Sequence, residues 1–212
     1  MITPTTITVE NVTLVLLAAG RSERFGDVGS KLDEDFLGKP LGLHVAVALG
    51  DMPFRERIAV TRTCRIDYAA QGFRVVRNDD PAGDMASSVK IGVRAAKEQG
   101  ADAVLLALAD MPRVTAAHIY RMLDVATDRT CVIASSDGRR TKPPALFGSE
   151  RFDFLLQLEG DQGARDLVAS GRHVVTSPAE LIDVDTREEL EELRELVRSP
   201  EAITRAVARR SG

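Results

Sequence analysis

Small and cationic residues follow an apolar run near the start of the chain, in the stretch 18–31. Small side chains let a backbone approach a ligand and direct its N–H groups at it. Arginine and lysine neutralise a polyanion, and the planar fork of arginine suits a phosphate group. The residues of this stretch that could act in this way are Ala18, Ala19, Gly20, Arg21, Ser22, Arg24, Gly26, Gly29 and Lys31. The pattern predicts a phosphate-binding loop, with a surface turn of solvated charges as the alternative.

Two common phosphate loops do not fit this stretch. The P-loop requires G-x-x-x-x-G-K-[ST], a spacing that the stretch lacks. The dinucleotide fingerprint requires G-x-G-x-x-G, which Ala18 and the long gap between Gly20 and Gly26 break. If the loop binds phosphate, it therefore does so by a different motif from these two.

An acidic residue follows a second apolar run, residues 103–109, in the sequence Asp110-Met111-Pro112. We expect this run to be a buried strand, so that Asp110 stands where the strand ends. A carboxylate there suits Mg²⁺, which needs few protein ligands and takes the others from water and phosphates. The alternative is a helix-capping role before Thr115. A second Asp-Met-Pro, at residues 51–53, follows a predicted helix and is expected to close it.

The stretch 17–31 resembles the L-A-A-G-x-S-x-R-x-G-x-x-K signature of nucleotidyltransferases that act on the molybdenum cofactor. The matching residues are Leu17, Ala18, Ala19, Gly20, Ser22, Arg24, Gly26 and Lys31. Residues 27–30 lengthen the gap that usually precedes the lysine. The resemblance implies that these residues, apart from Gly26, bind the nucleotide. It also implies that Arg24, Lys31 and Asp110 are the catalytic residues.

The same resemblance implies a magnesium site made of Asp110 and Asp185. The family has an Asp-x-Pro after a central strand and a D-x-D-T or N-x-N-T sequence near its end. This chain reads Asp183-Val184-Asp185-Thr186 there, and the second aspartate corresponds to the ligand. The alternative is that Asp185 and Thr186 only cap the helix predicted to follow them.

Two further blocks resemble the family. Gly83, Met85, Ser87 and Ser88 lie in a segment similar to the G-M-x-S-S of cytidylyltransferases, which contacts the base. The two serines could equally be plain helix caps.

Residues 160–165 resemble the family's G-D-x-G-A-R block, which lies towards the pterin substrate. This implies Asp161, Gly163 and Arg165 as substrate-binding residues, with a helical ion pair between Asp161 and Arg165 as the alternative. Where the family often has Gly-His-Pro or Arg-His-Pro, this chain has Lys142-Pro143-Pro144.

The function that the resemblance implies is Mg²⁺-dependent transfer of CMP, or else GMP, from an NTP to the phosphate of a molybdopterin cofactor. Pyrophosphate leaves. CTP is favoured over GTP because guanylyltransferase relatives usually read L-A-G-G where this chain has L-A-A-G. The implied partners are the nucleotide, the molybdopterin-type cofactor and a recipient molybdoenzyme or its chaperone. Two alternatives stay open: a sugar- or polyol-phosphate nucleotidyltransferase, and a non-enzymatic chaperone that binds nucleotide or molybdopterin.

The elements that must position these residues alternate between strands and helices. The predicted strands are 12–17, 57–61, 73–77, 103–109, 130–134, 145–147 and 173–176, and the predicted helices are 40–49, 86–99, 115–127, 149–158, 163–169 and 187–197. Such alternation, with several wholly apolar strands, predicts an α/β fold with a mostly parallel sheet covered on both faces. We therefore expect a single-domain Rossmann-like three-layer α/β/α sandwich. The resemblance implies the nucleotide-diphospho-sugar transferase type.

Composition limits the remaining possibilities. The 212 residues suit one domain, 1–212, with a core of about residues 11–198 and a basic tail at 199–212. The net charge of −4 at pH 7 argues against nucleic-acid binding. Cys64 and Cys131 fit no metal-ligand spacing and are expected to be reduced thiols of a cytoplasmic protein. The sequence shows no secretory signal and no apolar run of membrane-spanning length.

Overall fold

Two apolar segments form adjacent parallel strands at the centre of a sheet. In the computed structural model, which describes residues 6–20, 22, 25, 29–160 and 165–198, these are β1 (Val12–Ala18) and β6 (Ala103–Leu108). All seven residues of β1 are buried, as expected for a strand covered on both faces. Alternate side chains of β1 enter two separate hydrophobic clusters, because successive residues of a strand point to opposite faces.

Five further strands complete the sheet within the described residues. They are β4 (Glu56–Thr61), β5 (Arg74–Arg77), β7 (Val132–Ser136), β8 (Thr141–Gly148) and β9 (Arg172–Val175). The order across the sheet is β5-β4-β1-β6-β8-β7-β9, and β8 alone runs against its neighbours. The chain runs outward from β1 to β5 and then returns to β6 on the other side of β1. Ligands of α/β sheets bind at such a reversal, outside the carboxyl ends of the strands.

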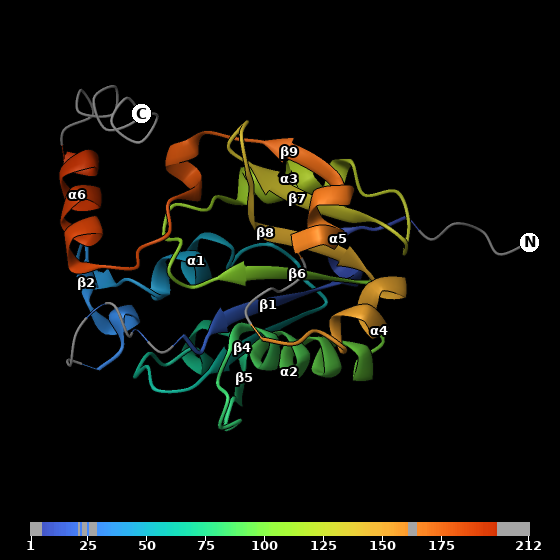
Figure 1. Ribbon diagram of the computed structural model, residues 1–212, viewed down its shortest axis with the longest axis horizontal. Helices are drawn as coiled ribbons and strands as arrows, with labels where there is room; N and C mark the ends of the chain where they lie inside the picture. Colours follow the sequence, from blue (N-terminus) through green and yellow to red (C-terminus); the bar gives the residue numbers. More distant parts are fainter. Residues whose placement is uncertain (1–5, 21, 23–24, 26–28, 161–164, 199–212) are drawn as a thin grey trace, which may run out of the picture.

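Helices cover both faces of this sheet (Figure 1). One face packs against α1 (Leu43–Ala48) and α3 (Ala116–Asp124). The other packs against α2 (Met85–Glu98), α4 (Phe152–Leu155) and α5 (Arg165–Ser170). Helix α2 lies close to β1 because Gly92 has no side chain: a Cβ there would lie 2.3 Å from Val15 Cγ1. The predicted three-layer α/β/α sandwich with a mostly parallel sheet is confirmed.

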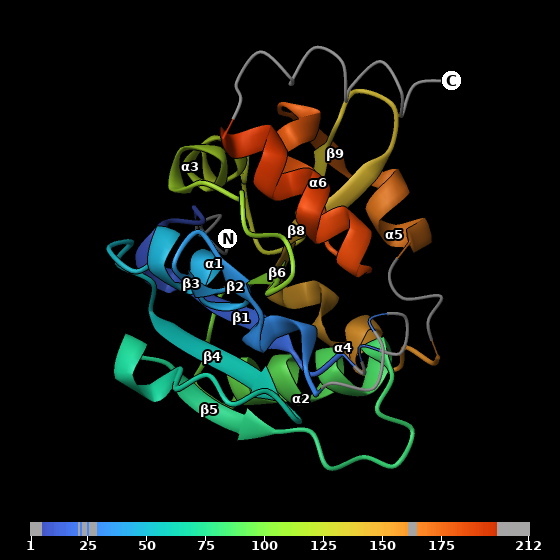
Figure 2. The same ribbon diagram turned by 90° about the vertical axis from the view of Figure 1, so that its left-hand side faces the viewer.

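A smaller unit lies at the carboxyl ends of the strands. The short strands β2 (Asp35–Phe36) and β3 (Lys39–Pro40) form an antiparallel hairpin. Helix α6 (Arg187–Arg198) packs against this hairpin through a third apolar cluster. The members of this cluster are Phe25, Phe36, Leu41, Val184, Leu190, Leu193 and Leu196. Figure 2 looks onto this edge of the molecule and shows α6 in front of the strand ends.

Short 3-10 turns connect several of these elements: Val9–Asn11, Lys31–Asp33, Ala69–Gln71, Ser149–Arg151 and Pro178–Leu181. None of the helices in the described ranges combines the length and the apolar character that a membrane crossing requires.

Three predicted elements differ from the structure. The helix predicted at 40–49 begins only at Leu43, because Lys39 and Pro40 form the second strand of the hairpin. The helix predicted at 149–158 is a 3-10 turn followed by the four-residue α4. The short strand predicted at 145–147 is the eight-residue β8, since backbone pairing with β7 extends it to Thr141. The predicted tail at 199–212 lies outside the described residues.

Candidate active site

A cavity of about 550 Å³ opens at the carboxyl ends of β1 and β6. Its lining includes loops that follow β1, β5 and β6, which meet where the strand order reverses. The lining residues are Leu17, Ala19, Gly20, Ser22, Lys31, Ala82, Gly83, Asp84, Met85, Ser88, Leu108, Asp110 and Asp185. Most residues that the sequence assigns to the nucleotide therefore surround one cavity. Ala18 and Ser87 are not among the lining residues, and the side chain of Ala18 packs in the core instead.

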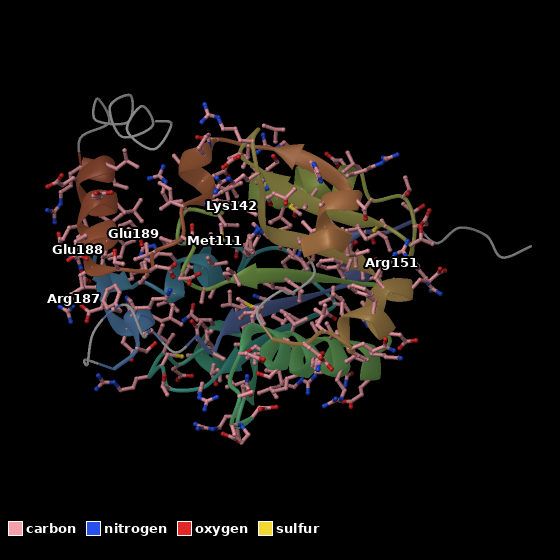
Figure 3. The ribbon with its side chains drawn as sticks, in the orientation of Figure 1. Met111, Lys142, Arg151, Arg187, Glu188 and Glu189 are labelled. Carbon is pink, nitrogen blue, oxygen red and sulfur yellow. The ribbon has the colours of Figure 1, made fainter. Side chains whose placement is uncertain are left out.

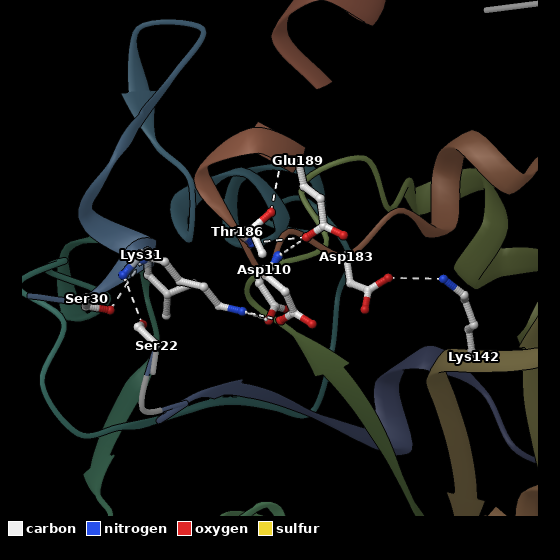
Figure 4. Close-up of polar contacts among 10 residues, drawn as sticks. Ser22, Ser30, Lys31, Asp110, Lys142, Asp183, Thr186 and Glu189 are labelled. Atoms are coloured by element: carbon white, nitrogen blue, oxygen red, sulfur yellow. Dashed lines mark hydrogen bonds and ion pairs between the residues drawn. The ribbon is translucent and has the colours of Figure 1, made fainter. Parts of the chain in front are cut away.

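Three charged side chains meet at the floor of this site. Lys31 Nζ lies 2.7 Å from Asp110 Oδ2 and 2.8 Å from Asp185 Oδ1 (Figure 4). The Lys31 side chain is only 8% exposed, against 19% for Asp110 and 28% for Asp185. The two residues predicted as magnesium ligands are thus brought together, with the predicted catalytic lysine between them.

Burial and neighbouring opposite charges shift the pKa values of Lys31 and Asp110 in opposite directions. Burial by itself would lower the pKa of Lys31, but the carboxylates of Asp110 and Asp185 outweigh it and raise that pKa. Burial raises the pKa of Asp110, and the nearby charges of Asp183 and Asp185 add to this while Lys31 opposes it. The lysine is therefore firmly cationic, and Asp110 depends on a nearby cation to stay ionised.

Two serines hold the lysine loop in place. Ser22 Oγ accepts a hydrogen bond from the backbone N–H of Lys31 at 3.0 Å, which ties the start of the loop to its end. Ser22 adopts a left-handed backbone conformation with φ of 55°, which few non-glycine residues do. Ser30 caps the 3-10 turn that begins at Lys31 by accepting from Leu32 N–H. The lysine is therefore held by local contacts on both of its sides.

The second carboxylate is positioned by the start of α6. Thr186 Oγ1 accepts from the N–H of Glu189, while Glu189 Oε2 accepts from the backbone N–H groups of Thr186 and Asp185 at 3.0 and 2.7 Å. This reciprocal arrangement is a capping box, which fixes the direction of the chain entering the helix. Val184 N–H also donates to Asp110 O at 3.0 Å. Thr186 thus caps the helix, and the Asp185 side chain turns to Lys31.

The site has the chemistry of a small divalent cation site. Asp110 Oδ1 is buried and has no hydrogen-bond partner among the residues that the structure describes, although its other oxygen contacts Lys31. A buried carboxylate oxygen without a partner is costly unless a ligand satisfies it. No group of three or more His, Cys, Asp or Glu side chains in the described ranges could hold a metal by itself. Two carboxylates fit Mg²⁺ or Mn²⁺, ions that take their remaining ligands from phosphates and water.

The start of α2 forms another wall of the cavity. Asp84 caps the helix by accepting from Ser87 N–H at 2.7 Å. The hydroxyls of Ser87 and Ser88 donate to Asp84 O, and both accept from the buried side-chain amide of Asn78. Their hydroxyls thus have partners within the chain, as plain caps would. Gly83, at φ of 52°, and the exposed Met85 present their surfaces to the cavity.

Some predicted residues lie outside the described part of the chain. These are Arg24, Asp161 and Gly163, and only the backbone of Arg165 is described, at the start of α5. The sequence reasoning did not single out Asn78 or Glu189. A signal existed for Glu189, because threonine followed three residues later by glutamate marks a capping box. No comparable local signal points to Asn78.

The histidines take no part in this site. His118 is buried, and its Nε2 lies 2.7 Å from Ser135 Oγ. His44 Nε2 bonds Phe36 O, and His173 Nε2 lies 3.2 Å from Val168 O. Each histidine therefore has a structural partner away from the carboxylate pair.

A seven-stranded sheet of this order, with a cavity at its reversal point, is the fold of the α/β nucleotidyltransferases. The chain belongs to the family described as the MobA-like NTP transferase domain, which matches residues 14–176. It is therefore an NTP-dependent nucleotidyltransferase of that family.

Two characterised relatives are similar in sequence. The purine catabolism protein PucB of Bacillus subtilis is 32% identical over 199 residues, which cover 85% of this chain and 94% of the relative. A molybdenum cofactor guanylyltransferase of Cereibacter sphaeroides is 32% identical over 126 residues, which cover 59% of this chain and 63% of the relative.

Two solved structures share the fold and some sequence. The homologue of Mycobacterium tuberculosis Rv0371c from Mycobacterium sp. strain JC1 has a TM-score of 0.73 at 25% identity, covering 90% of this chain and 99% of that one. Rv0371c itself, in complex with manganese, has a TM-score of 0.65 at 27% identity, covering 87% of this chain and 98% of that one. A member of the family therefore binds a divalent metal.

Proposed function

We propose that this NTP transferase moves a CMP group from CTP, with GTP as the alternative donor, to the phosphate of a molybdopterin-type cofactor. The reaction requires Mg²⁺ and releases pyrophosphate. The observation that carries the proposal is the meeting of Lys31, Asp110 and Asp185 at a cavity that is also lined by Leu17, Ala19, Gly20 and Ser22. A lysine for the triphosphate and two carboxylates for a metal are the groups that phosphoryl chemistry needs.

The bond changes are those of a single displacement at phosphorus. An oxygen of the acceptor phosphate attacks the α-phosphorus of the nucleotide and forms a new phosphoanhydride bond. The bond from the α-phosphorus to the bridging oxygen of the β-phosphate breaks, and pyrophosphate leaves with the electron pair. No covalent intermediate with a side chain is needed, so positioning and charge neutralisation carry the catalysis.

The chain's own residues have distinct tasks in this reaction. Lys31 donates to the triphosphate and, with Arg24, stabilises the charge that grows on the departing pyrophosphate. The backbone of residues 18–22 positions the triphosphate, and Gly20 leaves room for it to approach. Asp110 and Asp185 would hold the magnesium ion, which would supply positive charge to stabilise the negative charge that develops during the transfer.

The choice of nucleotide depends on the wall beside Gly20. Ala19 is 3% exposed and lines the cavity, so its methyl group occupies space that a glycine would leave open. We infer that this methyl group crowds a purine more than a pyrimidine. Gly83 and Met85 line the same cavity, and we expect them to contact the base.

The acceptor is assigned from the family relationship. The Cereibacter sphaeroides relative is a guanylyltransferase for the molybdenum cofactor. The matching block in this chain is 160–165, where Asp161, Gly163 and Arg165 are proposed to face the acceptor. A recipient molybdoenzyme, or its chaperone, would then take up the product.

The test is pyrophosphate release with each of the four ribonucleoside triphosphates, in Mg²⁺, with and without molybdopterin. We expect release only when acceptor and nucleotide are both present, and faster release with CTP than with GTP. The Asp110→Asn variant should release pyrophosphate about a hundredfold more slowly, or slower still, whereas Asp153→Asn, at an exposed carboxylate that pairs with Lys97, should match the wild type. Release without acceptor, or from none of the four nucleotides, would contradict the proposal. Equal rates with CTP and GTP would remove its nucleotide assignment.

A further inference from the structure

A second lysine stands at the same edge of the sheet. Because β8 runs antiparallel to β6, its first residues lie where β6 and β7 end. The register pairs Leu106 of β6 with Ala145 of β8, and Ser135 of β7 with Lys142, so Lys142 lies near the carboxyl end of β7 and at the same edge of the sheet as Asp110. Figure 3 shows Lys142 and Met111 on the side of the molecule nearer α6, with Arg151 at the other end. Lys142 is therefore a neighbour of the carboxylate pair, yet it is not among the residues that line the nucleotide cavity.

The ammonium group of Lys142 makes hydrogen bonds with two acceptors in the described part of the chain. Its Nζ donates to Asp183 Oδ1 at 3.0 Å and to Leu181 O at 3.1 Å. An ammonium group has three N–H bonds, and the third has no acceptor among the residues described here. The side chain is 32% exposed, so a ligand can reach it from solvent.

The segment 183–185 links the two lysines of the site. Asp185 contacts Lys31, whereas Asp183, two residues earlier, contacts Lys142. Figure 4 shows the result: Lys31 lies on one side of Asp110, and Asp183 with Lys142 lies on the other. The carboxylates that we assign to the metal therefore have one cation on each side.

The proposed reaction needs such an arrangement. It brings an acceptor phosphate and a nucleoside triphosphate together, and two polyanions repel each other unless cations neutralise both. Lys31 lines the cavity assigned to the nucleotide, so a second cation beside the acceptor would reduce the repulsion between the two polyanions. We propose that Lys142 binds the terminal phosphate of the acceptor, on the side of Asp110 and Asp185 that is away from Lys31. This inference rests on the proposed function and assigns the acceptor's class: a phosphate monoester.

Asp183 keeps Lys142 in place until the acceptor arrives. The Asp183 side chain is 45% exposed, and ion pairs with this much access to water contribute little. A phosphate monoester carries more charge than one carboxylate and accepts several hydrogen bonds. The phosphate of the acceptor can therefore replace Asp183 as the partner of Lys142 without disturbing the fold.

The experiment measures binding of molybdopterin, and of molybdopterin dephosphorylated by a phosphatase, to the full chain without nucleotide. Pterin fluorescence reports the two dissociation constants. The wild type should bind the phosphorylated form roughly 10- to 100-fold more tightly, which is the effect of one charged hydrogen-bonded contact. Lys142→Met should bind both forms equally, and Lys142→Arg should restore the preference. Lys97→Met, at an exposed lysine on α2, should behave as the wild type does.

Each outcome bears on one claim. A wild type without preference for the phosphorylated form would overturn the role of Lys142, as would Lys142→Met with the preference intact. Circular dichroism checks the fold of each variant, and Lys142→Gln replaces Lys142→Met if the latter does not fold. A retained preference together with no nucleotidyl transfer by the wild type would contradict the proposed function and leave Lys142 as a phosphate-binding residue.

Discussion

Replacing Lys31 by methionine removes the cation that contacts both Asp110 and Asp185. Methionine keeps most of the length and packing of the lysine stem, so the change is largely one of charge. Two carboxylates then lie close together in a partly buried site without the lysine that contacts both of them. We expect the variant to fold less stably and to acquire a stronger affinity for a divalent cation.

The size of the effect follows from the burial of the three groups. Breaking a buried ion pair by removing one partner costs about 3–5 kcal/mol. The two carboxylate side chains are 19% and 28% exposed, so water reduces the cost; we expect about 2–4 kcal/mol. For a domain of this size each kcal/mol lowers the Tm by about 2–4 °C, which gives a decrease of about 5–15 °C.

Scanning calorimetry in a chelating buffer, and then in Mn²⁺ or Mg²⁺, measures both effects. A metal ion at about 100 times its dissociation constant stabilises the folded state by about 2.7 kcal/mol. In the wild type the positive charge of Lys31 beside these carboxylates opposes binding of a metal ion, so the metal should raise the Tm of Lys31→Met more. Lys97→Met provides the matched control: it breaks a 2.6 Å ion pair whose side chains are 52% and 79% exposed, and it should cost less than about 1 kcal/mol.

Melting of Lys31→Met in chelator at the same temperature as Lys97→Met would contradict a stabilising role for Lys31. Equal increases in Tm on adding metal to the wild type and to Lys31→Met would show that the ion binds elsewhere.

Three further predictions concern catalysis, packing and pH. Asp110→Asn should lower the rate of nucleotidyl transfer by about a hundredfold or more, with the dissociation constant of CTP in chelator little changed; a near-normal rate would contradict its role. Gly92→Ala should lower the free energy of unfolding in urea by about 1–3 kcal/mol, because the new Cβ would lie 2.3 Å from Val15 Cγ1. Adding Val15→Ala to this variant should recover part of the loss. A double variant whose loss equals the sum of the two single losses would contradict the clash. Burial lowers the pKa of His118 below 6.5; the charge of Arg121 adds to this effect and that of Glu180 opposes it. As the pH drops below 6.5, His118 therefore binds a proton in the unfolded chain before it does so in the folded chain. The free energy of unfolding should fall accordingly. His118→Gln should flatten that slope, and an unchanged slope would show that other groups set it.

The centre of the fold could be predicted from the sequence because local pattern determines it. The apolar runs at 12–17 and 103–109 are strands in the structure, in the expected place and nearly the expected length. The general rule that ligands lie at the carboxyl ends of strands then placed Asp110 at the edge where the cavity opens. Neither step needed knowledge of contacts between distant segments.

Elements stabilised by pairing with distant segments were predicted poorly. Lys142, Pro143 and Pro144 look like a loop because proline cannot donate to a ladder. Nevertheless, Lys142 lies within β8, where it pairs with Ser135 next to a shift in the register between β7 and β8. The β2–β3 hairpin was also missed, because each of its strands has only two residues and α6 covers it from the far end of the chain.

In the site, too, local features could be predicted from the sequence and contacts between distant segments could not. The sequence identified Lys31 and Asp185 as candidates, but their contact joins residues 154 positions apart and could not be read from spacing. The lengthened gap before Lys31 is accommodated by the bond from its backbone N–H to Ser22. The sequence alone also could not decide whether Ser87 and Ser88 cap the helix or contact the base. Their hydrogen bonds with Asn78 form because the end of β5 lies beside the start of α2. No local sequence pattern predicts that β5 and α2 meet there.

We propose that Asp110, Asp185 and Lys31 together form the site of metal-dependent nucleotidyl transfer. The most direct measurement follows CTP labelled at the α- or the γ-phosphorus through a reaction with molybdopterin and Mg²⁺. We predict that the α-label enters the acceptor while the γ-label leaves in pyrophosphate, and that Asp110→Asn abolishes both. Transfer of the γ-label to the acceptor, recovery of the α-label only as free CMP, or full activity in Asp110→Asn would contradict the account.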